Sequence, residues 1–275
     1  MPMRRGVMII VGLALIAVFG MAVAAGKPRK AKPLKEASVE FTADGETERT
    51  AECNPGQEAV AGGFYIDRPG PVTIYPPFES ARDGKRGWSS RVYGSPDPRS
   101  VTAYAYCDKK EPALKTKAAT DSLKKIYGNL ITARCKRGQE AVSGGFDLPL
   151  SKAIVIASRR TGKRAWAVEV VGVPGTEVTV FAHCDKREPR LKAKQASTVP
   201  PASGNESASV VAQCKRKQQL RSGGFEGEYP GGMTAGQVDG SRRVGKRGWE
   251  VTGIGFGPER GLTAYAYCQK KPKKK

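Results

Sequence analysis

Histidine is almost absent from this 275-residue chain, and aromatic and acidic residues are sparse. The single histidine, His183, has no second imidazole with which to form a metal site or a catalytic dyad. Aromatic residues make up 7% of the chain, and 26 acidic residues stand against 47 Lys and Arg. No paired carboxylates recur, and no candidate nucleophile has an evident general base. These shortages argue against an enzyme, a metal site and a bound cofactor.

The one long apolar run lies at the N-terminus. Arg4 and Arg5 precede an uncharged segment from Gly6 to Ala25 that ends in small residues. A charged start, an apolar middle and a small-residue end are typical of a secretory signal peptide. A membrane anchor is the alternative, because about 20 apolar residues can just span a bilayer. Both interpretations predict that the rest of the chain is secreted or lies at an extracytoplasmic surface.

The charge excess persists beyond this segment. Without residues 1–25 the chain loses two arginines, which leaves 45 cations against 26 anions, a formal charge of +19. An excess of this size favours solubility and attraction to polyanions. Outside the cytoplasm the candidate partners are a cell-wall polymer, an acidic polysaccharide, an anionic lipid surface or extracellular nucleic acid.

Three copies of one pattern fill most of the chain. Each copy opens with a cysteine nine residues before Gly-Gly-Phe, continues with Ser-x-Arg-x-Gly-Lys-Arg-x-Trp, and closes on Ala-x-Cys. Repetition at this period is typical of an array of similar structural units. The chain therefore divides into a signal peptide or anchor (1–25), a basic linker (26–37), three repeats (38–111, 112–188 and 189–269) and a Lys-rich tail (270–275).

The six cysteines follow the same pattern. An even number of cysteines in an exported chain predicts a disulfide framework. One cysteine opens and one closes each copy, and each bond within a copy would close a loop of roughly 50 residues, worth about 4 kcal/mol. The expected bonds are Cys53–Cys107, Cys135–Cys184 and Cys214–Cys268.

The closing segments read as β-strands. Val101, Ala103 and Ala105 alternate with Thr102, Tyr104 and Tyr106, and a period of two predicts a strand. A weak helical pattern covers only 121–127. Further strands are expected at 38–42, 58–65, 72–75, 88–93, 153–157 and 166–171.

Four to six short strands per copy predict an all-β fold of three tandem disulfide-closed repeats. Two architectures remain open, small sandwich-like modules or a three-sheet prism. An immunoglobulin domain is not expected, because alanine stands two residues before each closing cysteine, where that fold carries tyrosine. These alanines are Ala105, Ala182 and Ala266.

Two resemblances bear on the architecture. The Cys-x-x-Gly…Gly-Phe opening and the threefold repetition resemble the vitelline membrane outer layer protein family, which implies a three-sheet β-prism. The longer pattern Cys-x-x-Gly…Gly-Gly-Phe…Trp…Ala-x-Cys is similar to that of uncharacterised secreted bacterial repeat proteins, and this similarity implies no activity. Copy 3 departs from both patterns, because Lys217 replaces the early glycine.

The basic segment before each tryptophan is the candidate binding site. A central glycine next to a strand predicts a hairpin tip, and the planar fork of arginine pairs with two oxygens of a phosphate, sulfate or carboxylate. Three weak sites on one chain gain from multivalency. The alternative is a solvated tip with no ligand. The candidate residues are Arg82, Lys85, Arg86, Arg159, Arg160, Lys163, Arg164, Arg242, Arg243, Lys246 and Arg247.

The aromatic residues offer a second possibility, stacking on sugars or bases. Each tryptophan recurs at a nearly fixed distance from the closing cysteine, which favours core packing instead. His183 occupies a position held by tyrosine in the other copies, so we expect a structural role for it. The tryptophans are Trp88, Trp166 and Trp249.

Together these patterns predict a non-catalytic, secreted or surface-associated binding protein that presents three basic hairpin tips to an anionic polymer. A structural or protein-partner module of the cell envelope is one alternative. A carbohydrate-binding, lectin-like protein is another. The Lys-rich segments at 26–35 and 270–275 are expected to be solubilising arms or electrostatic anchors.

Overall fold

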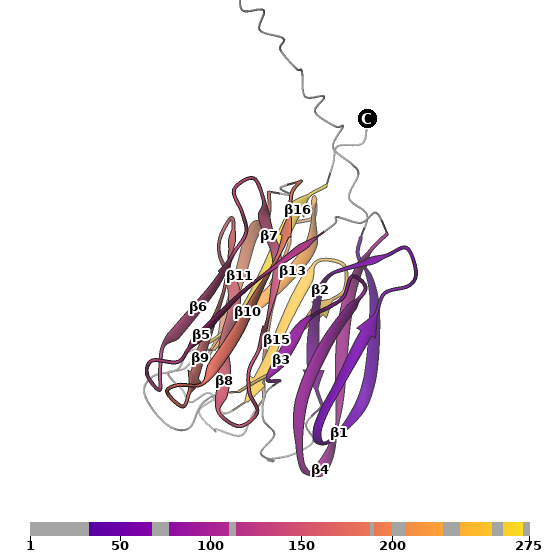
Figure 1. Cartoon of the computed structure of the whole chain (residues 1–275). Helices are drawn as coiled ribbons and strands as arrows, with labels where there is room; N and C mark the ends of the chain where they lie inside the picture. The colour runs from indigo at the N-terminus through magenta and orange to yellow at the C-terminus, as the bar shows by residue number, and fades with distance from the viewer. Residues whose placement is uncertain are drawn as a thin grey trace, which may run out of the picture.

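The computed structural model describes residues 33–67, 77–109, 114–187, 190–199, 207–227, 237–254 and 261–271. Strands account for every regular element in these ranges, which confirms the predicted all-β fold (Figure 1). No helix that could cross a membrane occurs among these residues. The apolar run at 6–25 and the expected strand at 72–75 lie outside them. The weak helical pattern at 121–127 is the end of a strand and a turn.

The three copies contribute equivalent strands. The long strands β1 and β4 of copy 1 correspond to two strands each in the other copies. Copy 1 contains β1 (Lys35–Glu52), β2 (Glu58–Ile66), β3 (Glu79–Asp83) and β4 (Gly87–Asp108). Copy 2 contains β5 (Lys115–Ser122), β6 (Asn129–Arg134), β7 (Glu140–Asp147), β8 (Ala153–Gly162), β9 (Ala165–Gly172) and β10 (Glu177–Asp185). Copy 3 contains β11 (Lys192–Thr198), β12 (Ala208–Gln213), β13 (Gln218–Gly227), β14 (Gln237–Val244), β15 (Gly248–Ile254) and β16 (Leu262–Lys270).

The strands form two hydrogen-bonded sheets, and each sheet combines strands from different copies. The order β11-β16-β13-β8-β9-β6 joins three strands of copy 3 to three strands of copy 2. The ten-stranded sheet has the order β12-β15-β14-β2-β4-β3-β7-β10-β5, with β1 also paired to β4. It contains strands of all three copies, and its two halves meet at the long strands β1 and β4. One half of β4 pairs with β2 and the other half pairs with β3. All pairings are antiparallel. The six-stranded sheet and the two halves of the ten-stranded sheet, which meet at β1 and β4, give the molecule three antiparallel sheet faces.

The contacts between copies form a ring. The Gly-Gly-Phe strand of each copy pairs with the basic-segment strand of the preceding copy, in the pairs β7 with β3, β13 with β8, and β2 with β14. The last of these pairs joins copy 1 to copy 3. These two copies are not consecutive in the chain, so no short peptide connects them. Of the two architectures left open by the sequence, the pairing corresponds to a three-sheet prism.

The three disulfides are those expected from the repeat. They join Cys53 to Cys107, Cys135 to Cys184 and Cys214 to Cys268. All six cysteines are buried, with 4% exposure or less. Each bond ties the turn before the Gly-Gly-Phe strand to the end of the closing strand.

The two glycines of Gly-Gly-Phe have different tasks. A Cβ on Gly144 would lie 2.1 Å from a ring atom of Trp166, so the first glycine makes room for the tryptophan of its own copy. A Cβ on Gly145 would lie 2.4 Å from the backbone oxygen of Ser80, so the second admits the strand of the preceding copy. The same relations hold for Gly62 and Gly63 and for Gly223 and Gly224.

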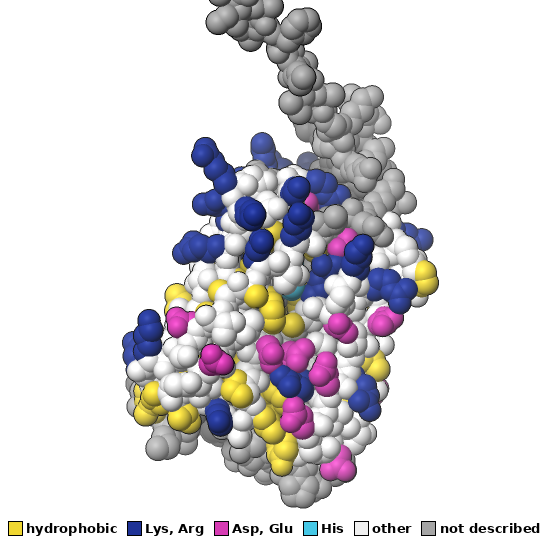
Figure 2. Space-filling view, viewed as in Figure 1, with side chains coloured by type: hydrophobic (Ala, Val, Ile, Leu, Met, Phe, Trp, Pro, Cys, Tyr) yellow, Lys and Arg dark blue, Asp and Glu magenta, His cyan; other side chains and the backbone are white. Residues whose placement is uncertain are grey.

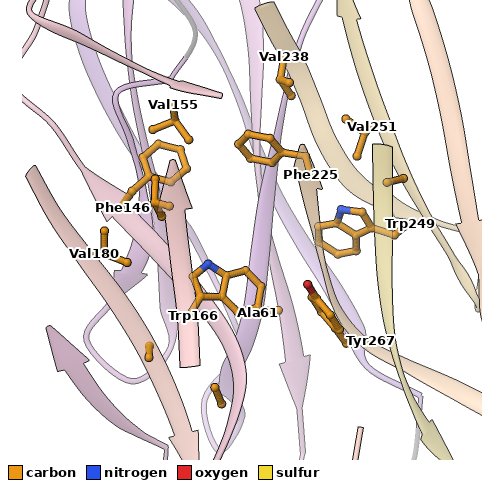
Figure 3. Packing of buried hydrophobic residues seen from close by; sticks show 14 of the residues in the cluster. Ala61, Phe146, Val155, Trp166, Val180, Phe225, Val238, Trp249, Val251 and Tyr267 are labelled. Atoms are coloured by element: carbon orange, nitrogen blue, oxygen red, sulfur yellow. The ribbon is translucent and has the colours of Figure 1, made fainter. Parts of the chain in front are cut away.

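The phenylalanines meet where the three copies converge. The rings of Phe64 and Phe146 each contact Phe225 edge to face, with centroids 6.1 and 6.4 Å away. Figure 3 shows Phe146 and Phe225 facing each other, with Trp166 and Trp249 beside them. One continuous apolar cluster therefore includes residues of all three copies.

The tryptophans are core residues, as their spacing suggested. They are 1–2% exposed, and in each copy the indole N–H donates to the hydroxyl of the serine that begins the basic segment. The donor–acceptor distance is 3.0 Å in all three copies. The serine of the Ser-x-Arg-x-Gly-Lys-Arg-x-Trp pattern thus accepts the hydrogen bond of the buried indole N–H of the same pattern.

Candidate binding site

Each basic segment forms the turn of a β-hairpin, as predicted. The hairpins are β3–β4, β8–β9 and β14–β15. Gly84 and Gly245 have φ angles of +55° and +58°, in the left-handed region that favours glycine. The conserved spacing within the repeat therefore places Lys-Arg immediately after the sharpest point of the turn.

The three tips lie at one end of the prism. The backbone N–H groups of Cys53, Cys135 and Cys214 donate to Arg86, Arg164 and Arg247 at distances of 2.8–3.0 Å. Each tip therefore lies beside a disulfide. The closing cysteines in turn pair with the first residues of β1, β5 and β11. We call this the disulfide end. The end of β16 also lies there, beside Cys268 (Figure 1).

One arginine of each tip, Arg160 in copy 2, points inward. Its guanidinium donates to a carboxylate oxygen of Glu140 (2.6 Å) and to the backbone oxygen of Leu191 (3.3 Å). Its side chain is 8% exposed and that of Glu140 is 1% exposed. Glu140 also accepts the backbone N–H groups of Arg190 and Leu191 at 2.6 and 2.9 Å. This cluster fixes the connector that leads into copy 3.

The other two copies use the same arginine at their junctions. Arg82 pairs with Glu58 and reaches the backbone oxygen of Leu114, which precedes copy 2. Arg243 donates to the backbone oxygen of Leu34 at 2.6 Å and to Glu36 at 3.2 Å. The Leu-Lys connectors of the sequence are thus the partners of these arginines, and each tip holds the start of the next copy around the ring.

A second pair of arginines is engaged on the sheet surface. Arg159 forms an ion pair with Glu226 at 3.1 Å, and Arg242 forms one with Glu250 at 2.9 Å. The guanidinium of Arg242 also lies over the ring of Tyr65, 3.9 Å from its centroid. Copy 1 has Ala81 at the corresponding position. Because glutamates neutralise them, these two arginines add less to the positive surface potential than their sequence position suggested.

The remaining predicted cations form the outer part of the tips. Lys85, Lys163, Arg164 and Lys246 are exposed, and Arg86 and Arg247 are partly exposed. Figure 2 shows lysine and arginine side chains gathered toward the disulfide end, while acidic side chains lie nearer the middle of that face. The structure therefore brings six of the predicted site residues together at one end and uses the others mainly to hold the fold.

The turns that follow the opening cysteines add cations that the sequence analysis did not include in the site. Hydrogen bonds between Cys135 and Arg164 and between Ala141 and Lys163 place the copy 2 turn beside its tip. The exposed cations of these turns are Lys136 and Arg137 in copy 2 and Lys215, Arg216 and Lys217 in copy 3. The repeated Cys-Lys-Arg could have indicated them, since it lies next to the disulfide.

A buried ring contact links neighbouring copies close to the tips. The hydroxyls of Tyr106 and Tyr267 accept the backbone N–H groups of Arg243 and Arg160 at 2.6 and 2.7 Å. Their rings lie against tryptophans of the preceding copy, 5.5 Å between centroids. Burial raises the pKa of both tyrosines, so the hydroxyls remain neutral hydrogen-bonding groups.

His183 takes the place of this tyrosine in copy 2. Its ring lies 5.4 Å from that of Trp88, and Nδ1 is 3.1 Å from the hydroxyl of Thr116. The side chain is fully buried. Burial, and secondarily the positive charge of Arg82, lowers the pKa of His183 to about 3. The imidazole is therefore neutral at pH 7, in agreement with a structural role.

Replacing Tyr267 with phenylalanine tests the tyrosine contact. We expect the free energy of unfolding to fall by about 1–2 kcal/mol, because the Arg160 N–H loses its acceptor while the ring packing remains. Urea denaturation of both proteins gives this difference. Thr120→Val serves as a control, since its exposed hydroxyl pairs with that of Thr179 on the protein surface. An equal loss in both variants would contradict a special contribution from the buried hydroxyl.

Comparison with known proteins gives no further assignment: no protein-family model matches the chain, and no curated protein matches it. Among the residues that the structure describes, no group of three or more His, Cys, Asp or Glu side chains is placed to hold a metal ion. The argument for function therefore depends on the geometry of the disulfide end.

Proposed function

We propose that this protein is a non-catalytic, extracytoplasmic binding protein whose disulfide end contacts an anionic polymer. The observation that carries the proposal is the placement of all three basic tips at one end of a single prism. Three tips on separate modules could have pointed in any direction. On the prism they share one end with Lys35, at the start of β1, and Lys270, at the end of β16.

The electrostatics of this end support the proposal. The chain has a sequence pI of about 9.9. The inward arginines occupy the nearby buried carboxylates, so Glu58 and Glu140 do not offset the outer lysines and arginines in solution. Cations on several neighbouring turns create a positive potential that attracts a polyanion over about a Debye length and concentrates it at the surface.

The disulfides are consistent with an extracytoplasmic location. Three disulfides in a chain of this size are typical of an oxidising compartment. The candidate polymers are therefore those outside the cytoplasm, such as cell-wall polymers, acidic polysaccharides and extracellular nucleic acid.

Salt-dependent binding tests the proposal. We expect residues 26–275 to bind immobilised heparin, DNA or teichoic acid, with the logarithm of the binding constant falling linearly with the logarithm of the salt concentration. The double variant Lys163→Ala/Arg164→Ala is expected to bind roughly tenfold more weakly and to reduce the salt slope by about 1–2.

The matched control removes two cations from the opposite end. Lys124 and Lys125 lie in the turn after β5, whose last residue pairs with the first residue of β10, far from the disulfide. Lys124→Ala/Lys125→Ala is expected to change the affinity less than twofold. Binding that is absent or independent of salt would contradict the proposal and favour a structural or protein-partner module. Preferential binding to neutral glycans on an array would favour a lectin.

A further inference from the structure

The disulfide end has threefold architecture, but its charge does not follow the threefold symmetry. The two loops that face outward in each copy are the turn after the opening cysteine and the hairpin tip. They occupy residues 52–57 and 83–86 in copy 1, 134–139 and 161–164 in copy 2, and 213–218 and 244–247 in copy 3. Equivalent backbone positions therefore allow a direct comparison of side chains.

In copy 1 the two loops are electrically neutral. Lys85 and Arg86 are matched by Glu52 and Asp83. Arg86 forms an ion pair with Glu52 at 2.7 Å. Asp83 accepts the hydroxyl of Thr50 at 3.2 Å, which keeps this carboxylate at the tip. A polyanion that approaches copy 1 meets attraction and repulsion of similar size.

In copies 2 and 3 the same loops carry cations only. Arg134 and Thr161 stand where copy 1 has Glu52 and Asp83, and copy 3 has Gln213 and Val244 at these two positions. Neither pair of loops contains an acidic residue. Their cations are Arg134, Lys136, Arg137, Lys163 and Arg164 in copy 2, and Lys215, Arg216, Lys217, Lys246 and Arg247 in copy 3.

Basic residues also occupy the junction between copies 2 and 3. Glu140 holds the backbone of Arg190 and Leu191 beside the copy 2 tip, which leaves the Arg190 side chain exposed. The next residue, Lys192, is exposed and pairs with Cys268 at the copy 3 disulfide. At the junction between copies 3 and 1, by contrast, Glu36 follows Lys35. The connector thus carries positive charge from the copy 2 loops to the copy 3 loops.

From this asymmetry we infer that the binding surface is one continuous basic track over copies 2 and 3, and that its ligand is a linear polymer with regularly spaced phosphate or sulfate groups. The inference rests on the proposed function and narrows it. The cations lie on separate loops along the track, so a single anion meets one or two of them while a chain meets many in succession. Arginines at 134, 137, 164, 190, 216 and 247 provide forked donors for tetrahedral oxyanions.

Three double variants at equivalent positions test the track. Binding of long-chain polyphosphate and of heparin is measured for Lys163→Ala/Arg164→Ala, Lys246→Ala/Arg247→Ala and Lys85→Ala/Arg86→Ala. Each of the first two is expected to weaken binding about tenfold. The third removes the same two residue types from copy 1. Its loss of affinity is expected to be several-fold smaller than that of either of the first two. Polyphosphate and heparin separate phosphate from sulfate as the preferred group.

A gain-of-charge variant provides the complementary test. Glu52→Arg/Asp83→Thr gives copy 1 the residues of copy 2 at these positions and removes the internal neutralisation. It is expected to strengthen binding severalfold and to steepen the salt slope, because a third set of loops joins the surface. Tripolyphosphate is expected to bind at least a hundredfold more weakly than the long chain.

The outcomes separate this inference from the proposed function. Equal losses in all three double variants would show a threefold ring, which overturns the track and leaves polyanion binding standing. Equal affinities for tripolyphosphate and the long chain would overturn the linear ligand. No salt-dependent binding to either polymer by the unchanged protein would overturn the proposed function itself.

Discussion

Replacement of Gly144 with alanine is expected to lower the free energy of unfolding by about 3 kcal/mol or more. The added Cβ would lie 2.1 Å from a ring atom of Trp166 and 2.5 Å from the backbone oxygen of Phe181. Trp166 is 1% exposed and its N–H donates to Ser158, so displacing the ring disrupts buried packing and a buried hydrogen bond. Guanidinium denaturation followed by tryptophan fluorescence measures the loss.

Gly162→Ala is the matched control. Nothing lies within 4 Å of a Cβ at that position, which is at the exposed end of β8. We expect its free energy of unfolding to stay within about 0.5 kcal/mol of the unchanged protein. A loss below about 1 kcal/mol for Gly144→Ala would mean that the tryptophan layer is more plastic than the packing indicates.

The same experiment reports on cooperativity. Each copy carries one tryptophan, and every sheet contains strands of at least two copies. A defect in copy 2 should therefore destabilise all three copies together, with one transition for fluorescence and for far-ultraviolet circular dichroism. Two separate transitions would contradict the shared core.

Acid is expected to destabilise the protein through His183. The pKa of this imidazole is about 3 in the folded protein, because of burial and the nearby Arg82, and about 6.5 in the unfolded chain. Between these values the unfolded state binds more protons, so stability falls as the pH falls. The slope is about 1.4 kcal/mol per pH unit at mid-window, and the total reaches about 4 kcal/mol between pH 7 and pH 3.

His183→Tyr isolates this contribution. Tyrosine occupies the equivalent position in the other two copies, where its hydroxyl accepts a backbone N–H from the neighbouring copy. The variant is expected to match or exceed the stability of the unchanged protein at pH 7. Below pH 6.5, its free energy of unfolding is expected to fall much less steeply with falling pH than that of the unchanged protein. Denaturation curves at several pH values give both slopes. Identical slopes would show that other groups cause the acid sensitivity.

The sequence predicted the local structure of each copy well. Cysteine spacing gave the three disulfides, and alternation in segments such as 101–107 gave the closing strands. The Ser-to-Trp spacing gave the hairpins. These features depend on contacts within one copy, and threefold repetition makes such contacts visible in a single sequence.

The arrangement of copies could not be predicted in the same way. The repeated pattern is the same in all three copies and does not show which strand pairs with which neighbour, so a prism and three separate modules predict the same repeat. For the same reason, Arg160 and Arg164 look alike in sequence. Only the carboxylate of Glu140 and the backbone oxygen of Leu191, from another part of the chain, distinguish an inward arginine from an outward one.

The ring of copies also has a seam, at the contact between copy 3 and copy 1. Arg160 and Arg82 are held at their junctions by buried glutamates, with side chains 1% and 5% exposed. At the seam, Arg243 pairs instead with Glu36, whose side chain is 38% exposed. No peptide connection follows this tip into copy 1, so water can compete for the ion pair and separation of the two copies stretches no connector. Local opening of the native protein should therefore begin there, which would give the β2–β14 amides faster hydrogen exchange than those between β3 and β7 or between β8 and β13.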